Sequence, residues 1–197
     1  MTYDLLLALT GFAFVTSVTP GPNNMMLLAS GVNFGFMRTV PHMLGISMGL
    51  VPMVMLLGLG LAGVFQAAPW ALTLLKGVSV GYMLWLAWKI AHAAAPGKGR
   101  AAPKPFSFLQ AAAFQWVNPK AWMMVLGAIS AYAPGAQIRS LVVVVAVFCA
   151  VNLPSIALWA AMGEGLRGWL AQPARLRLFN WTMAGLLVAS LLPVLRM

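Results

Sequence analysis

Long apolar stretches separated by short polar gaps run along the whole sequence. An α-helix needs about 20 residues to cross a bilayer, and each stretch reaches about that length or more. The pattern predicts six transmembrane helices, at about 4–30, 41–64, 69–92, 106–132, 138–162 and 178–196. We therefore expect an all-α, polytopic membrane protein that forms a single integral-membrane domain over 1–197.

The gaps between these stretches define the expected loops. They lie at 31–38, near Gln66, at 96–105, at Pro134-Gly135 and at 164–177. The last gap mixes Trp169 and Leu170 with arginines, which is typical of a segment at the membrane interface. The N-terminus has no basic region and no convincing cleavage site, so we expect a retained first helix and not a signal peptide.

Helix breakers fall at corresponding places in two halves of the chain. The first helix of the first half (about 4–92) contains Pro20 and Pro22, and the first helix of the second half (about 106–197) contains Pro119. A cytoplasmic linker at about 93–105 separates the halves. Because each half has three helices, the second runs inverted relative to the first, as in many secondary transporters with interrupted helices. The spacings agree only within a few residues, so chance similarity is the alternative.

Composition excludes a soluble globular protein. Hydrophobic residues make up 62% of the chain and charged residues only 7%, whereas soluble domains are about half apolar and a quarter charged. The net charge of +10 does not indicate nucleic-acid binding, because the basic residues lie mostly in the gaps between apolar stretches. The protein is therefore expected in a membrane.

Basic residues concentrate in the first, third and fifth gaps. They are Arg38 in the first, Lys98, Arg100 and Lys104 in the third, and Arg167, Arg175 and Arg177 in the fifth. The fourth gap has Arg139 alone. The positive-inside rule places the three basic loops in the cytoplasm and both termini outside; Arg196 opposes this assignment.

The run Thr19-Pro-Gly-Pro-Asn-Asn24 interrupts the first predicted helix. Its prolines remove hydrogen-bond donors, so backbone groups at the break must face protein or a water-filled cavity. We expect Thr19 to cap a second half-helix with Pro20 as its first residue. The freed N–H groups would attract a substrate carboxylate. A simple proline kink is the alternative, although Asn23 and Asn24 need polar partners in a helix core.

The run Asn118-Pro119-Lys120 repeats this logic in the fourth predicted helix. Asn118 suits an N-cap and Pro119 a first helical residue. Lys120 then lies near the bilayer midplane, where an ammonium group needs pairing or hydration. Snorkelling to an interface is the alternative for Lys120 and for Lys76 in the third helix.

An ordered set of residues runs through nearly the whole chain. Its members are the run 19–28 (TPGPNNMMLL), Gly31, Gly35-Phe36, Pro41-His42, Gly45, Lys76-Gly77, Gly81-Tyr82, Asn118-Pro119-Lys120, Phe179-Asn180 and Gly185. This set resembles the signature of the lysine-exporter and threonine/homoserine-exporter family, LysE/RhtB. The resemblance implies an exporter of amino acids or related metabolites in the inner membrane of bacteria, driven by the proton-motive force. It implies neither an enzyme nor a cofactor.

Acidic residues are scarce, which bears on substrate and coupling. A lysine or arginine site needs a buried carboxylate for the side-chain cation, and the chain has only Asp4 and Glu164, near helix ends. Small neutral substrates such as homoserine or threonine fit better, with Asn152 adding hydrogen bonds to those of the two breaks. The alternative is that backbone carbonyls at a broken helix bind the ammonium of a basic substrate. Asp4, His42 and Glu164 are the coupling candidates. Each has a plain alternative: helix capping for Asp4, solvation or an incidental hydrogen bond for His42, and pairing with Arg167 for Glu164.

Other functions are weighed against the exporter. A divalent metal-ion exporter needs carboxylate, thiolate or imidazole clusters, and the chain has two acids, two separated histidines and the single Cys149. A passive channel is a further alternative, and a lipid enzyme lacks an acid–base grouping. Gly45-x-x-x-Gly49 and Gly77-x-x-x-Gly81 favour close packing between the second and third helices, with a homodimer seam as the alternative.

Overall fold

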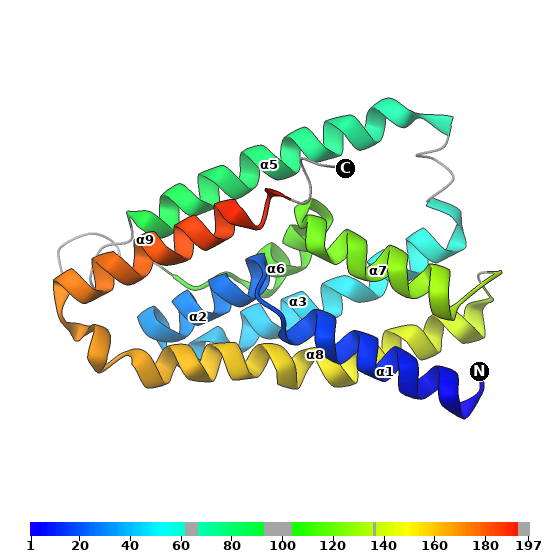
Figure 1. Cartoon of the computed structure of the whole chain (residues 1–197), viewed down its shortest axis with the longest axis horizontal. Helices are drawn as coiled ribbons and strands as arrows, with labels where there is room; N and C mark the ends of the chain where they lie inside the picture. Colours follow the sequence, from blue (N-terminus) through cyan, green and yellow to red (C-terminus); the bar gives the residue numbers. More distant parts are fainter. Residues whose placement is uncertain (62–66, 93–103, 136, 193–197) are drawn as a thin grey trace.

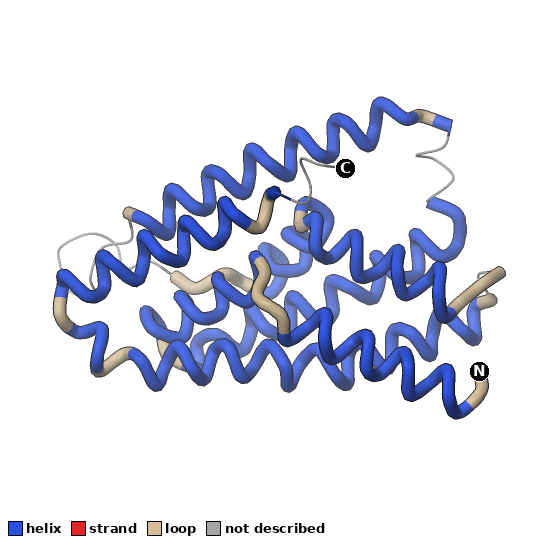
Figure 2. Tube along the Cα trace, in the orientation of Figure 1, coloured by secondary structure: helices blue, strands red, loops and turns tan. Residues whose placement is uncertain are grey.

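The computed structural model describes residues 1–61, 67–92, 104–135 and 137–192. Regular structure in these residues is helical, as the sequence predicts (Figures 1 and 2). The elements are α1 (Tyr3–Val18), α2 (Pro22–Phe34), α3 (Phe36–Leu56), η1 (Leu57–Leu61), α5 (Pro69–Ala91), α6 (Phe108–Phe114), η2 (Gln115–Val117), α7 (Pro119–Tyr132), α8 (Ile138–Leu166), η3 (Trp169–Ala171) and α9 (Pro173–Ala189).

In the described residues, each predicted apolar stretch is mostly helical. The first comprises α1 and α2, bent by 54° at their junction, and the fourth comprises α6, η2 and α7. In the described part of the chain, Phe36–Gly60 and Ile138–Leu166 are each long and apolar enough to cross a membrane alone. The bent pair α1 and α2 makes a third crossing if it is one span. The six-span arrangement stays a prediction.

Two expected loops are helical instead. Residues 31–38 are almost entirely helix, because α2 continues to Phe34 and α3 begins at Phe36. Gly35 alone connects them, with a φ of 84° that favours glycine. In the gap at 164–177, Arg175 and Arg177 belong to α9. The expectation of a link between helices is therefore wrong for these two residues, and the position of the segment at the membrane interface stays a prediction.

Other expected boundaries fare differently. The turn at Pro134-Gly135 is confirmed, with a φ of 79° at Gly135. The loop at Gln66, most of the linker at 93–105 with its Lys98 and Arg100, and Arg196 lie outside the described residues.

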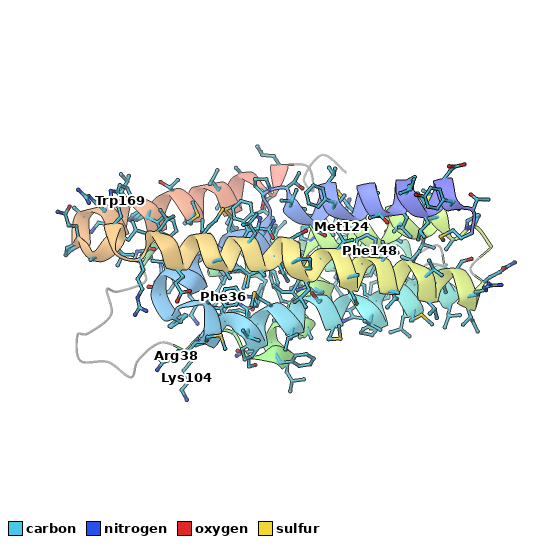
Figure 3. All side chains as sticks on the ribbon, turned by 90° about the horizontal axis from the view of Figure 1, so that it is seen from below. Phe36, Arg38, Lys104, Met124, Phe148 and Trp169 are labelled. Carbon is cyan, nitrogen blue, oxygen red and sulfur yellow. The ribbon has the colours of Figure 1, made fainter. Side chains whose placement is uncertain are left out.

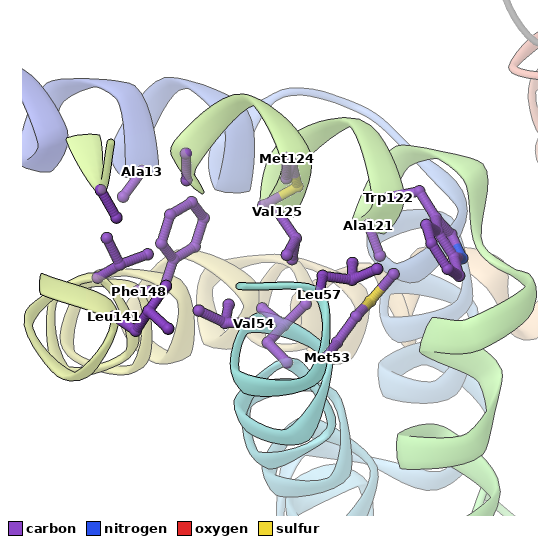
Figure 4. Packing of buried hydrophobic residues seen from close by; sticks show 14 of the residues in the cluster. Ala13, Met53, Val54, Leu57, Ala121, Trp122, Met124, Val125, Leu141 and Phe148 are labelled. Carbon is purple, nitrogen blue, oxygen red and sulfur yellow. The ribbon is translucent and has the colours of Figure 1, made fainter. Parts of the chain in front are cut away.

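The N-terminal helices pack against the long helix α8. α1, α2 and α3 all contact it, and α5 lies along α9 on the opposite side of the bundle (Figure 1). One hydrophobic core joins α1, α3, α7 and α8, with Ala13, Val54, Val125 and Phe148 as members (Figure 4). A second core joins α2, α5, α6 and α9. The break between α1 and α2 therefore lies at the boundary between two cores.

Glycines in α3 permit close approach to α6. A Cβ atom added at Gly45 would lie 2.7 Å from Ala111 Cβ, and one added at Gly49 would lie 2.8 Å from Ala112 Cα. The sequence predicts that Gly45 and Gly49 pack between the second and third helices. This prediction is wrong, because both glycines pack on α6. Gly77 and Gly81 on α5 have open space where a Cβ would be.

Basic side chains mark one end of the bundle. Arg38 and Lys104 lie at the same end as Trp169 (Figure 3). The Arg175 guanidinium lies 5.1 Å from the centroid of the Trp169 ring, and its Nη1 donates to the Trp169 carbonyl. This is the end that the positive-inside rule assigns to the cytoplasm.

Candidate functional site

The break in the first predicted helix is built by Thr19, Pro20 and Gly21. Thr19 ends α1, since its N–H still donates to the Val15 carbonyl, and its ψ of 142° is extended. Proline forces this conformation on the residue before it. Gly21 is the N-cap of α2 and Pro22 its first residue. The expected Thr19 cap with Pro20 as first residue is therefore wrong by two positions.

Lys120, from α7, reaches across to the end of α1. Its Nζ donates hydrogen bonds to the Thr19 carbonyl, to Thr19 Oγ1 at 3.0 Å and to the Pro20 carbonyl at 3.4 Å. We call these three acceptors the Thr19–Pro20 oxygens. Carbonyls at the C-terminal end of a helix carry partial negative charge, which favours a cation there. Lys120 neither snorkels away nor lies free for a carboxylate.

Gly21 makes room for this crossing. A Cβ at residue 21 would lie 2.5 Å from Lys120 Cδ and 3.0 Å from its Nζ. The φ of Gly21 is −173°, an extended conformation open to any residue. The glycine is thus required by the approach of the Lys120 side chain and not by its own backbone conformation.

The start of α7 forms as predicted. Asn118 is its N-cap, with its Oδ1 accepting from the Lys120 N–H at 3.2 Å, and Pro119 follows as first residue. By contrast, no side chain caps the N-terminus of α2. The first-turn N–H groups of a helix have no partner within it. Those of Asn23 and Asn24 therefore have neither an intrahelical bond nor a side-chain cap.

A paired amide contact links the two breaks. Asn23 Nδ2 donates to Gln115 Oε1 at 2.8 Å, and Gln115 Nε2 donates back to Asn23 Oδ1 at 3.3 Å. Gln115 is fully buried and lies in η2, just before Asn118. Sequence reasoning missed Gln115, although a glutamine inside an apolar stretch three residues before Asn-Pro-Lys was the available signal.

A second polar chain ties α8 to the end of α1 and to α3. Ser47 Oγ donates to Asn152 Oδ1 at 3.0 Å, and Asn152 Nδ2 donates to Ser17 Oγ at 3.1 Å. Asn24 Nδ2 donates to the carbonyls of Ser17 and Thr19 at 2.9 and 2.8 Å. The sequence predicts Asn24 and Asn152 at the site, but it does not predict the two serines.

These groups surround one cavity of about 320 Å³, part of it open to solvent. That figure includes open solvent, and the space that a water-sized molecule can occupy is about 20 Å³, which is room for about one water molecule. Its lining consists of Thr16, Ser17, Gly21, Asn23, Asn24, Leu50, Gln115, Asn118, Lys120, Ala121, Met124, Asn152 and Ile156. Of the residues in this lining, Lys120 is the only one with an ionisable side chain. The cavity combines amides, hydroxyls and a single cation.

Eight predicted residues do not line the cavity. Four of them, Thr19, Pro20, Pro22 and Pro119, belong to the two helix breaks beside it, and the other four lie elsewhere. Lys76 is half-buried on α5, and Glu164 is exposed near the C-terminal end of α8. Asp4 is exposed in the first turn of α1, whose cap is Thr2 and not Asp4. His42 is buried against Phe106, with ring centroids 5.3 Å apart, and neither ring nitrogen has a hydrogen-bond partner among the described residues. The expectation of a solvated or hydrogen-bonded His42 is therefore wrong.

Metal ligands do not gather in the described residues. No group of three or more His, Cys, Asp or Glu side chains is close enough there to hold an ion. The described cavity lining offers amides, hydroxyls and one ammonium group, whereas divalent cations prefer carboxylates or imidazoles.

Comparison with known proteins identifies the family. A family model described as LysE type translocator matches residues 14–192. The cysteine/O-acetylserine efflux protein of Escherichia coli strain K12 is 37% identical over 169 residues, which is 83% of this chain and 85% of that protein. The protein of the same name from Salmonella typhimurium strain LT2 is 36% identical over the same shares. No solved structure matches significantly. The chain thus belongs to the LysE type translocator family, the family of membrane exporters that its motifs resemble.

Proposed function

We propose that this protein exports small, neutral amino acids or related metabolites from the cytoplasm and is driven by the proton-motive force. The observation that carries the proposal is the cavity at the two helix breaks, with its amides, its hydroxyls and its single cation. The named relatives export cysteine and O-acetylserine. These compounds share with homoserine and threonine a small size, a zwitterionic backbone and an uncharged side chain.

The substrate carboxylate is assigned to the N-terminus of α2. The first-turn N–H groups of Asn23 and Asn24 lie beside the cavity without a side-chain cap. Such groups carry partial positive charge and bind anions well. The amides of Gln115 and Asn152 are assigned to the substrate's polar side chain. Lysine and arginine are disfavoured, because no carboxylate lines the described cavity.

The architecture of the exporter is assigned by analogy between its halves. In six spans arranged as inverted repeats, α3 would correspond to α8 and α5 to α9, and each corresponding pair is in contact. Alternating access would then rock one half against the other around the two breaks. The basic end with Arg38 and Lys104 faces the cytoplasm in this arrangement, with both termini outside. A homodimer through Gly77 and Gly81 stays a prediction.

Counterflow in proteoliposomes tests the function directly. We expect the purified protein to exchange labelled cysteine, O-acetylserine, homoserine or threonine and to discriminate against lysine, arginine and acidic amino acids. Preference for lysine or arginine would refute the neutral-substrate assignment. Flux that does not depend on the proton gradient would indicate a channel. Thermal stabilisation by divalent metal ions would revive the metal-exporter alternative.

The variants Asn24→Ala and Pro22→Ala test the site. Asn24 ties α2 to the end of α1 through two hydrogen bonds, so its loss should abolish export without affecting membrane insertion. Asn33→Ala is the matched control, because Asn33 lies on α2, bonds to the Ala29 carbonyl and does not line the cavity. Normal export by both Asn24→Ala and Pro22→Ala would remove this site assignment.

A further inference from the structure

We propose that the Lys120 ammonium and the α-ammonium of the substrate compete for the Thr19–Pro20 oxygens, and that this competition couples amino-acid export to proton entry. The proposal rests on the proposed export function and adds the residue and the step that perform coupling.

The Thr19–Pro20 oxygens form a binding site suited to a primary ammonium group. Nζ of Lys120 has three N–H donors, and three acceptors surround it. The Thr19 hydroxyl donates its own hydrogen to the Thr16 carbonyl at 3.2 Å, which leaves a lone pair of its oxygen for Nζ. An α-amino acid carries the same –NH₃⁺ group. The site that now holds Lys120 would therefore accept the substrate's ammonium through the same contacts.

The break between α1 and α2 places that ammonium site beside the proposed carboxylate site. Thr19 and Pro20 immediately precede Gly21, and the uncapped N–H groups of Asn23 and Asn24 follow it. The negative end of α1 and the positive end of α2 thus meet at one break, with Gly21 between them. An α-amino acid has its two charges on adjacent carbons, so the two helix ends match a zwitterion in sign and order.

Two ammonium groups cannot share this site. At about 4 Å, two positive charges repel by roughly 4 kcal/mol even with an effective dielectric constant of 20. None of the other residues lining the cavity, from α1, α2, α3, η2, α7 and α8, is ionisable, so the described lining has no carboxylate to neutralise a second cation. A lysine amine can lose its proton inside a protein. Displaced Lys120 would therefore give its proton to water and remain as a neutral amine.

This exclusion produces antiport with a simple proton balance. On the cytoplasmic side the substrate enters, and an N–H bond of Lys120 breaks to release one proton to the cytoplasm. On the outer side the substrate leaves, and Lys120 takes one proton from outside and returns to the Thr19–Pro20 oxygens. One proton enters for each zwitterion exported. The cycle moves one positive charge inward and responds to both the pH gradient and the membrane potential.

The coupling candidates Asp4, Glu164 and His42 are not needed in this scheme. Asp4 and Glu164 are exposed near opposite ends of the bundle, and His42 is enclosed beside Phe106, outside the cavity lining. In the described cavity lining, only Lys120 combines an ionisable group with contact to both helix breaks.

The test compares Lys120→Met, Lys120→Arg and the control Lys89→Met in proteoliposomes. Lys89 lies on α5 with its Nζ 4.4 Å from the centroid of the Trp85 ring, away from the cavity. For each variant we would measure counterflow of labelled cysteine, efflux driven by an imposed pH gradient, and cysteine affinity across pH. Thermal stability in detergent monitors folding.

Wild type and Lys89→Met should lose cysteine affinity as pH falls, by up to about tenfold per pH unit where one proton competes with the substrate. In Lys120→Met, cysteine binding should lose this pH dependence, and efflux should lose its response to the pH gradient. Lys120→Arg keeps the cation and the helix-end contacts, and a guanidinium does not deprotonate. Lys120→Arg should be as stable as wild type and yet fail to transport. If the role of Lys120 were only structural, the arginine variant would still transport.

Proton-coupled transport by Lys120→Arg, or pH-dependent affinity in Lys120→Met, would overturn the competition while leaving the exporter assignment intact. Absence of counterflow for every amino acid in the wild type would overturn the proposed function, and this proposal with it.

Discussion

Substitution of Gly21 by alanine tests whether Lys120 really lies across the break. The added Cβ would come within 2.5 Å of Lys120 Cδ and 3.0 Å of Nζ, so both cannot stay in place. The flexible side chain moves more easily than the backbone. We therefore expect Lys120 to withdraw from the Thr19–Pro20 oxygens, leaving carbonyls at the end of α1 without their cation.

The size of the effect follows from the hydrogen bonds that Lys120 makes to these oxygens. Hydrogen bonds to a charged group contribute a net of about 1.5–3 kcal/mol, so Gly21→Ala should lower the free energy of unfolding by that amount. Gly11→Ala is the matched control, because a Cβ at Gly11 on α1 meets nothing within 4 Å. There the same substitution should raise stability by up to about 1 kcal/mol, since alanine favours helix.

The assay is reversible unfolding in mixed micelles, followed by tryptophan fluorescence, for both variants and for Gly21→Ala in a Lys120→Ala background. Without the lysine side chain, Gly21→Ala should lower the free energy of unfolding by less than about 0.5 kcal/mol, because the added Cβ no longer meets Lys120. Such a departure from additivity is expected only of residues that interact. An equal cost of Gly21→Ala with and without Lys120 would refute the proposed crossing.

Two further predictions concern the surroundings of the site. Gln115→Leu removes the amide that bridges to Asn23. It should reduce counterflow at least tenfold while leaving the protein in the membrane. Near-normal exchange would show that the bridge is dispensable. Gly49→Val should destabilise the protein by more than about 2 kcal/mol, because its Cβ would meet the α6 backbone at 2.8 Å. Gly81→Val is the control, because a Cβ there has open space. Equal thermal stability of the two variants would contradict the α3–α6 packing.

Structural features that depend only on neighbouring residues could be predicted from the sequence. The helix breaks at Pro20 and Pro119, the Asn118 cap and the turn at Pro134-Gly135 depend on fixed φ angles, missing donors and short-range hydrogen bonds. The sequence predicts the break at Thr19–Pro22 correctly but not its cap, since either proline could begin α2.

Contacts between distant segments could not be predicted in this way. Ser17 and Ser47 are unremarkable in a helix, and only folding brings them to Asn152. The position of His42 near the end of an apolar stretch predicts an aqueous interface, yet Phe106 from a distant segment covers it. The sequence indicates that the Lys120 ammonium needs pairing or hydration, but it does not show that the carbonyls of Thr19 and Pro20 lie within reach of that side chain.

The contact between Lys120 and Thr19 also constrains how the protein is made. The two residues are 101 positions apart, which at about 5–20 residues per second is a delay of roughly 5–20 s during synthesis. Until α7 arrives, the last carbonyls of α1 have no lysine, and Asn23 has no Gln115. The N-terminal segments therefore enter the bilayer before their polar groups can be satisfied, and the break must stay hydrated or shielded at the insertion machinery until translation has passed the middle of the chain.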